Sequence, residues 1–76
     1  MKKEILEALE ATRPENDFSS SIDFVGDGLL DSLDVVVLVS ELELMFGIQI
    51  PGESIIAQNF CSVVAIENLL LALEGP

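Results

Sequence analysis

The chain has 76 residues, half of them apolar, and a formal net charge of −11 that arises from 14 acidic residues against three basic ones. A chain of this length forms one domain, here residues 1–76, and buries roughly 60% of its unfolded surface on folding. The acidic balance disfavours nucleic acid and anionic membranes as partners, because both are bound through basic patches. It favours partner proteins that have basic docking surfaces.

The histidine and cysteine content narrows the range of possible functions further. Histidine is absent and Cys61 is the single cysteine, which leaves no Ser–His or Cys–His nucleophile pair, no ordinary zinc site and no internal disulfide. An enzyme is therefore disfavoured, and Cys61, which has apolar neighbours, is predicted to lie in the core. No apolar run approaches a membrane span, and the first ten residues are too acidic for a signal peptide. We expect a cytoplasmic protein without membrane insertion.

The first predicted element is a helix over residues 3–12. Ile5, Leu6 and Leu9 recur at helical spacing, and Pro14 ends the helix nearby. The solvated side carries the glutamates Glu4, Glu7 and Glu10.

A long connection rich in Ser, Asp, Asn and Gly follows over residues 14–31. Because structureless loops of this length are unusual in a small domain, we expect its apolar residues to pin it across the core. These residues are Phe18, Ile22, Phe24, Val25, Leu29 and Leu30. A calcium loop is rejected, because Val25 stands where the EF-hand pattern of Asp23, Asp27, Gly28 and Asp34 needs an oxygen ligand, and no metal site is predicted.

The central element is a helix over residues 32–46. Asp31 stands at the N-cap position, so that Ser32 is the first helical residue, and Gly47 follows as a left-handed C-terminal cap. The β-branched run Val35–Val37 would suit a strand, but fifteen residues without Pro or Gly favour a helix. The predicted core stripe comprises Val35, Leu38, Val39, Leu42, Met45 and Phe46.

The opposite side of this helix is also mostly apolar. It carries Leu33, Val36, Val37, Ser40 and Leu44, flanked by Asp34 and Glu41 on one side and Glu43 on the other. Such a face either meets another part of the domain or docks a partner, since a short chain cannot easily cover both faces of a central helix.

The remaining chain predicts a short helix and a long one. Residues 48–51 form an extended turn, and residues 53–57 form a short third helix with Ile55 and Ile56 as its apolar residues. Ser62 caps a last helix over residues 63–74, which Gly75 and Pro76 terminate. Its core stripe is Val63, Ile66, Leu69, Leu70 and Leu73.

The run Gly28-Leu29-Leu30-Asp31-Ser32-Leu33 resembles the acyl carrier protein family, including its peptidyl and D-alanyl carrier relatives. The resemblance covers about three quarters of the chain and continues through Glu41-Leu42, Phe46-Gly47-Ile48, Ile50-Pro51, Asn59-Phe60 and Ser62-Val63. It implies an all-α fold, a small four-helix bundle with three longer helices, one short helix and a long first loop.

The resemblance also implies a site. In that family the serine of the Asp-Ser-Leu triplet, here Ser32 between Asp31 and Leu33, receives 4′-phosphopantetheine from coenzyme A through a phosphopantetheinyl transferase. The thiol of this arm holds an acyl or aminoacyl cargo as a thioester and presents it to partner enzymes of fatty-acid, polyketide or nonribosomal-type biosynthesis. The positive end of the helix dipole would favour the phosphodiester by roughly 0.3–1 kcal/mol.

The partners would be the transferase, a loading enzyme and downstream transferases or synthases, and the chain itself is expected to be a monomer. Their predicted docking surface comprises Leu33, Asp34, Val36, Val37, Ser40, Glu43 and Leu44. Acidic residues commonly line this face in fatty-acid carriers, whereas this chain has Val37 and Leu44, which leaves the cargo open. The alternative function is a non-carrier helical interaction module that docks through the same apolar stripe without a cofactor.

Overall fold

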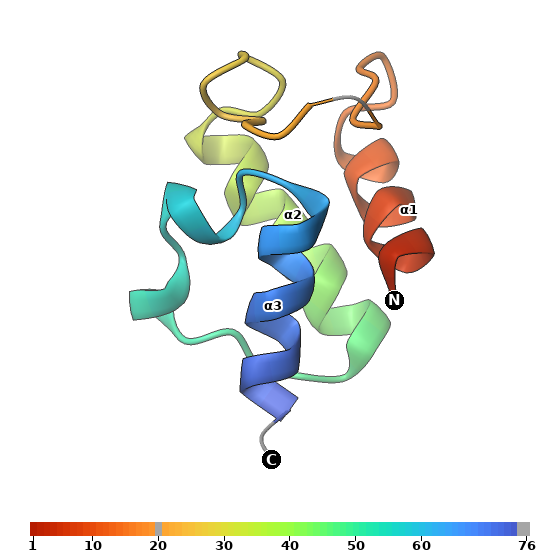
Figure 1. The fold of residues 1–76 in the computed structure, drawn as a ribbon. Coiled ribbons are helices and arrows are strands. Elements are labelled where there is room, and N and C mark those ends of the chain that lie inside the picture. The colour runs from red at the N-terminus through yellow and green to blue at the C-terminus, as the bar shows by residue number, and fades with distance from the viewer. Residues whose placement is uncertain (20, 75–76) are drawn as a thin grey trace.

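Three α-helices surround a hydrophobic core in the computed structural model, which describes residues 1–19 and 21–74 (Figure 1). They are α1 (Lys2–Thr12), α2 (Ser32–Phe46) and α3 (Val63–Glu74). Two 3₁₀ turns, η1 (Gly52–Ser54) and η2 (Ala57–Asn59), lie between α2 and α3. No strand occurs in the described ranges, which confirms the predicted all-helical class.

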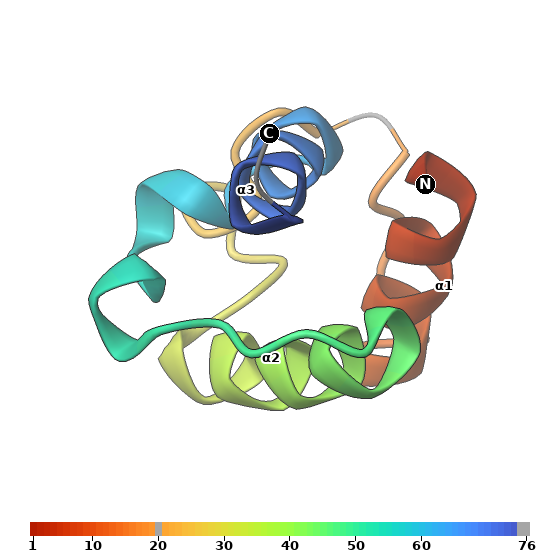
Figure 2. The same ribbon diagram turned by 90° about the horizontal axis from the view of Figure 1, so that it is seen from below.

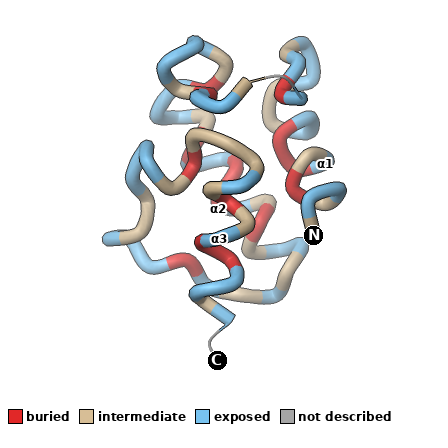
Figure 3. The backbone as a smooth tube through the Cα atoms, in the orientation of Figure 1, coloured by how far each residue is buried: buried red, intermediate tan, exposed pale blue. Residues whose placement is uncertain are grey.

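Helix α1 holds the arrangement together by contacting both α2 and α3. Figure 2 shows α2 and α3 on opposite sides of the core, with α1 closing one side and the segment that contains η1 and η2 closing the other. The buried residues therefore come from all three helices and from the loops, and Figure 3 marks their positions along the backbone in red. The largest fully buried ones are Phe24, Phe60, Ile5, Leu9, Leu38, Leu42, Ile66 and Leu70.

The bounds of α2 agree with the prediction, and the caps explain them. Asp31 has an extended backbone and its side chain accepts from the Asp34 N–H, while Gly47 adopts the left-handed conformation at φ 64°, which a residue without a Cβ adopts freely. The predicted core stripe is buried or packed against the core, with one exception. Met45 is 40% exposed, because it lies at the edge of the stripe and in the last turn of the helix.

The two outer helices also follow the predicted pattern. In α1, which begins one residue earlier than predicted, Ile5 and Leu9 are buried and Leu6 is partly buried. At the start of α3 the Ser62 hydroxyl accepts from the Ala65 N–H at 3.0 Å, which confirms the predicted cap. The predicted stop at Gly75 and Pro76 lies outside the described residues.

The long connection before α2 is fastened to the core at several points. The Phe18 and Phe24 rings meet edge to face with centroids 5.1 Å apart, and the Phe24 N–H donates to the Cys61 carbonyl at 2.7 Å. Ile22 was predicted to help pin the loop, and this is wrong, because it is 85% exposed. The two phenylalanines occupy the core positions that this part of the loop supplies.

Cys61 was predicted to lie in the core, and this is also wrong. The residue is only partly buried, and its thiol is 3.3 Å from the Gln58 carbonyl as a weak donor. The core position next to it is taken by Phe60, which is fully buried.

The short helix predicted over residues 53–57 does not form. Two 3₁₀ turns stand there instead, and Ile56, between them, has an extended backbone at φ −127° and ψ 153°. A stretch this short gains too few hydrogen bonds to offset helix nucleation, and the β-branched pair Ile55-Ile56 favours extended backbone. The structure therefore gives three helices and two turns within the described residues, and the four-helix count is not confirmed.

Candidate functional site

Ser32 lies at the surface as the first residue of α2. Its hydroxyl makes no hydrogen bond to any residue that the structure describes. The hydroxyl is therefore free to react, while the backbone on both sides of it is fixed by the hydrogen bonds of its neighbours.

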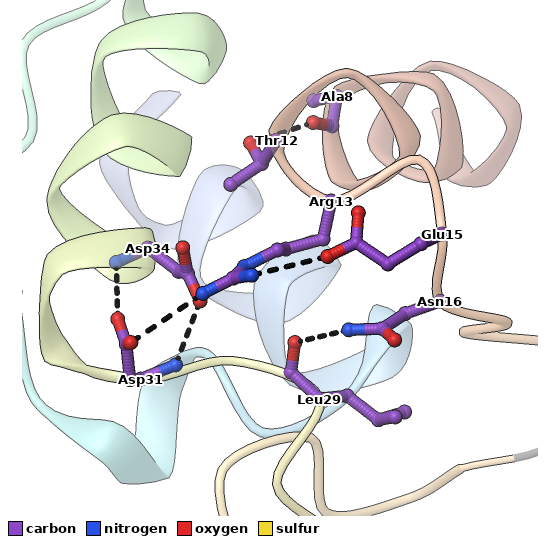
Figure 4. Close-up of polar contacts among 8 residues, drawn as sticks. All are labelled: Ala8, Thr12, Arg13, Glu15, Asn16, Leu29, Asp31 and Asp34. Carbon is purple, nitrogen blue, oxygen red and sulfur yellow. Dashed lines mark hydrogen bonds and ion pairs between the residues drawn. The ribbon is translucent and has the colours of Figure 1, made fainter.

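Asp31 and Asp34 form a capping box around Ser32. The Asp31 Oδ1 accepts from the Asp34 N–H at 2.9 Å, and the Asp34 Oδ2 accepts from the Asp31 N–H at 3.0 Å (Figure 4). These two reciprocal bonds satisfy amides that the first turn of a helix leaves unpaired. The hydrogen bond from Asp31, followed by the bonds from Arg13, lowers the pKa of Asp34 from its ordinary value of 3.8, although partial burial opposes the shift.

Arg13 joins the end of α1 to this capping box. Its Nε donates to the Asp34 Oδ2 at 2.8 Å, one terminal nitrogen lies 3.5 Å from the Asp31 Oδ2, and the other donates to Glu15 at 3.0 Å (Figure 4). Hydrogen bonds to Asp34 and then to Glu15 raise the pKa of Arg13 above its ordinary value. The guanidinium therefore stays charged and ties together groups from α1, the loop and α2.

The chain just before the site is held by a second polar contact. The Asn16 side chain donates to the Leu29 carbonyl at 2.9 Å. Gly28 has a φ of 76°, a left-handed conformation that strains other residues. The loop thus makes a tight turn at Gly28 and enters α2 along a defined path.

An apolar groove of about 320 Å³ opens beside Ser32. It lies between the start of α2 and the segment that contains η1 and η2. Its lining consists of Val25, Asp31, Ser32, Val35, Val36, Ile55, Ile56 and Ala57. A flexible arm attached at this end of α2 would therefore have an apolar surface to lie on.

The outer face of α2, formed by Leu33, Val36, Val37, Ser40 and Leu44, is exposed. Leu33 is 75% exposed and Leu44 is 82% exposed. Farther along the helix, a shallow hollow of about 470 Å³ is lined by Ser40, Glu43, Leu44, Ile48 and Gln49.

The two acidic residues predicted to dock partners are engaged inside the molecule. The Asp34 side chain is only 13% exposed and belongs to the capping box. The Glu43 Oε2 accepts from the Ile50 N–H at 2.9 Å and so holds the turn that follows α2. The outer face of α2 therefore presents apolar side chains, and two of the carboxylates beside it, those of Asp34 and Glu43, are held in contacts within the molecule.

Comparison with known proteins decides the family. Residues 2–69 match the family described as the phosphopantetheine attachment site. The chain belongs to this family of phosphopantetheine carriers. The match includes α1, the capping box, the groove and most of α3. No curated protein and no solved structure matches the chain.

Carrier domains of this family hold 4′-phosphopantetheine covalently and perform no catalysis themselves. The residues of this carrier fit that group, because an unbonded hydroxyl lies at a helix N-terminus, which favours an anionic phosphate, and an apolar groove begins next to it. No helix within residues 1–19 and 21–74 is long and apolar enough to cross a membrane.

Sequence reasoning missed two parts of the candidate site. One is Arg13, whose partners Asp31 and Asp34 lie 18 and 21 positions later in the chain, beyond any local pattern. A weak signal was present, because Arg13 is the one basic residue beyond position 3. The other is the groove wall from Ile55 to Ala57, which the erroneous short helix concealed.

Proposed function

We propose that Ser32 is the residue of this carrier to which 4′-phosphopantetheine is attached. The observation that carries the proposal is the free hydroxyl of Ser32, which lies between the two aspartates of the capping box and beside an apolar groove. When bound, the group supplies a thiol that holds a cargo as a thioester. The chain itself fixes the attachment point, provides an apolar surface for the arm and offers a face to partner enzymes.

Four other serines that the structure describes are less suitable attachment points. The Ser19 and Ser21 hydroxyls donate to aspartates at 2.6 Å and 2.7 Å. The Ser62 hydroxyl caps α3. Ser40 is exposed, but it lies two turns into α2, away from the groove and from the positive end of the helix dipole. Ser40 is therefore the matched control on the same helix.

The test is intact mass after incubation with coenzyme A and a broad phosphopantetheinyl transferase. We expect one phosphopantetheine addition in the native chain and in Ser40→Ala, and none in Ser32→Ala. Circular dichroism of the same samples verifies that each variant is folded. Addition to folded Ser32→Ala would place the attachment on another residue and overturn the proposal.

The partners of this carrier are proposed to dock on the outer face of α2. Four apolar side chains exposed on one side of the helix that begins at the attachment point support this choice, because buried apolar centres contribute most of the binding energy in interfaces. The proposed cargo is an acyl or aminoacyl group that belongs to fatty-acid, polyketide or nonribosomal-type biosynthesis. Basic residues on a partner would complement the overall acidic charge of the carrier.

The alternative function, a helical interaction module without a cofactor, would use the same exposed face. Membership in the phosphopantetheine attachment family favours the carrier. The mass experiment separates the two, because an interaction module would bind a partner while remaining unmodified.

A further inference from the structure

Positive charge in this chain is scarce and unevenly placed. Lys2 and Lys3 are exposed at the start of α1, whereas Arg13 is 37% exposed and lies at the other end of that helix. The Arg13 guanidinium approaches three carboxylates at once, those of Glu15, Asp31 and Asp34. One of the few cations of an acidic chain thus lies at the helix start that carries the proposed attachment serine.

The contacts of Arg13 fix the residues on both sides of Ser32. The Asp34 Oδ2 that accepts from Arg13 also accepts from the Asp31 N–H, and Arg13 reaches the Asp31 carboxylate as well (Figure 4). Both halves of the capping box are therefore held from α1. A planar guanidinium suits this task, because its donors lie in a rigid fork, which the single ammonium of lysine lacks.

The charges at this site make Arg13 important for the loaded carrier. A phosphodiester on Ser32 adds a negative charge directly after Asp31 and two positions before Asp34. Like charges at close range repel each other, most strongly where solvent screening is incomplete. Arg13 is the one side-chain cation among the described residues that contacts these carboxylates. A phosphodiester on Ser32 would therefore add negative charge next to a group of carboxylates that one guanidinium already contacts.

We propose that Arg13 is a positioning residue for phosphopantetheine attachment, which orders the backbone around Ser32 for the transferase and offsets the negative charge of the loaded site. This inference rests on the proposed attachment at Ser32. A purely structural ion pair near the surface predicts something different, namely a small loss of stability that is equal in the unmodified and the modified forms.

The experiment compares Arg13→Gln, Arg13→Lys and the control Lys3→Gln, which removes one positive charge from the exposed start of α1. Phosphopantetheine transfer is measured with kcat and KM determined separately, and melting temperatures are measured for the unmodified and modified forms of each variant. The split between kcat and KM matters, because loss of a cation makes the carrier more acidic and strengthens its attraction to a basic transferase surface.

For Arg13→Gln we expect kcat to fall by about fivefold or more, because a displaced attachment group reacts more slowly, while KM stays equal or decreases. Modification should lower the melting temperature of Arg13→Gln more than that of the native chain, and added NaCl should reduce the difference. Lys3→Gln, which removes the same amount of charge, should match the native chain in kcat and in the change of melting temperature on modification, while its KM should stay equal or decrease as in Arg13→Gln. Arg13→Lys keeps the positive charge and should therefore restore the native change of melting temperature on modification. It should restore kcat less fully, because kcat depends on the forked donors of the guanidinium, which lysine lacks.

Two results would overturn the inference in distinguishable ways. If modification is confined to Ser32 but Arg13→Gln retains the native kcat, or melts lower by the same amount in both forms, Arg13 has only a structural role and the proposal for Arg13 fails alone. If folded Ser32→Ala is still modified, the proposed attachment residue fails, and the role of Arg13 fails with it.

Discussion

Asp31 and Asp34 bind each other's backbone amides across the first turn of α2, with donor–acceptor distances of 2.9 Å and 3.0 Å. This reciprocal pair explains why the helix begins at Ser32. A serine placed between the two partners is held by its backbone while its hydroxyl stays free. The arrangement thus separates the structural task, which the aspartates perform, from the chemical task that we propose for the serine.

The capping role of Asp31 predicts a modest change in stability. Asp31→Ala removes the acceptor for the Asp34 N–H and should lower the free energy of unfolding by about 1 kcal/mol. Asp31→Asn keeps an acceptor at this position and should remain close to the native chain. Urea unfolding followed by circular dichroism measures both. Equal stability of the alanine and asparagine variants would show that the cap contributes little.

The lowered pKa of Asp34 predicts a contribution to stability that acid removes. Its ordinary value is 3.8, and the hydrogen bond from the Asp31 N–H, then those from Arg13, lower the value in the folded state. The contribution is therefore complete above pH 3.8 and is lost as the pH falls through the lower folded pKa. The stability difference between the native chain and Asp34→Asn should be constant near neutral pH and should shrink below about pH 4. Urea unfolding across this range tests the prediction, and a difference that does not change with pH would contradict it.

The exposure of the outer face of α2 predicts that charges are tolerated there. Val37 is 49% exposed and Leu44 is 82% exposed, so Val37→Glu and Leu44→Glu should keep the native helicity. Both should slow transfer by the native loading enzyme, because they place charge in an apolar docking centre. Leu38→Glu is the matched control, since Leu38 is fully buried and an unpaired buried charge should unfold the chain. Loading kinetics and circular dichroism on the same samples decide the matter, and folded variants that load at the native rate would place docking on another surface.

Glu43 is expected to contribute to the stability of the fold more than to the binding of partners. The sequence placed it at the rim of the docking face, where Glu43→Lys would mainly slow association, but its Oε2 accepts from the Ile50 N–H. Glu43→Ala should lower the free energy of unfolding by about 1 kcal/mol, whereas Glu43→Gln, which keeps an acceptor, should cost less. Amide hydrogen exchange at Ile50 provides a local readout. Unchanged protection in Glu43→Ala would show that this bond is not maintained in solution.

The high negative charge predicts that salt stabilises the fold. Fourteen acidic residues face three basic ones, and their repulsion is screened over a Debye length of roughly 8 Å at physiological ionic strength. The melting temperature should therefore rise with NaCl and rise more steeply with Mg²⁺. Calorimetry from low to moderate salt measures the effect. A flat response would mean that the repulsion is unimportant for stability.

The sequence alone determined the parts of this protein that depend on neighbouring residues. The bounds of α2 followed from Asp31 and Gly47, because a capping side chain and a left-handed glycine act within about one helical turn. Ser62 marked the start of α3 in the same way. Helical spacing then identified most of the core, and the run around Ser32 indicated the carrier family.

Tertiary structure decided what depends on residues far apart in the chain. The contact between Arg13 and the capping box joins the end of α1 to the start of α2, across the long loop between them. The groove beside Ser32 forms only where Val25 and the segment from Ile55 to Ala57 meet the start of α2. Periodicity gives the direction of a side chain on its own helix but not the space that other segments have filled. For this reason Met45 was predicted to be buried and is exposed, while Glu43, predicted as a surface charge, holds the turn after α2. Ile22, in the long loop, was predicted to be buried only because it is apolar, and it is exposed because other residues fill the core there.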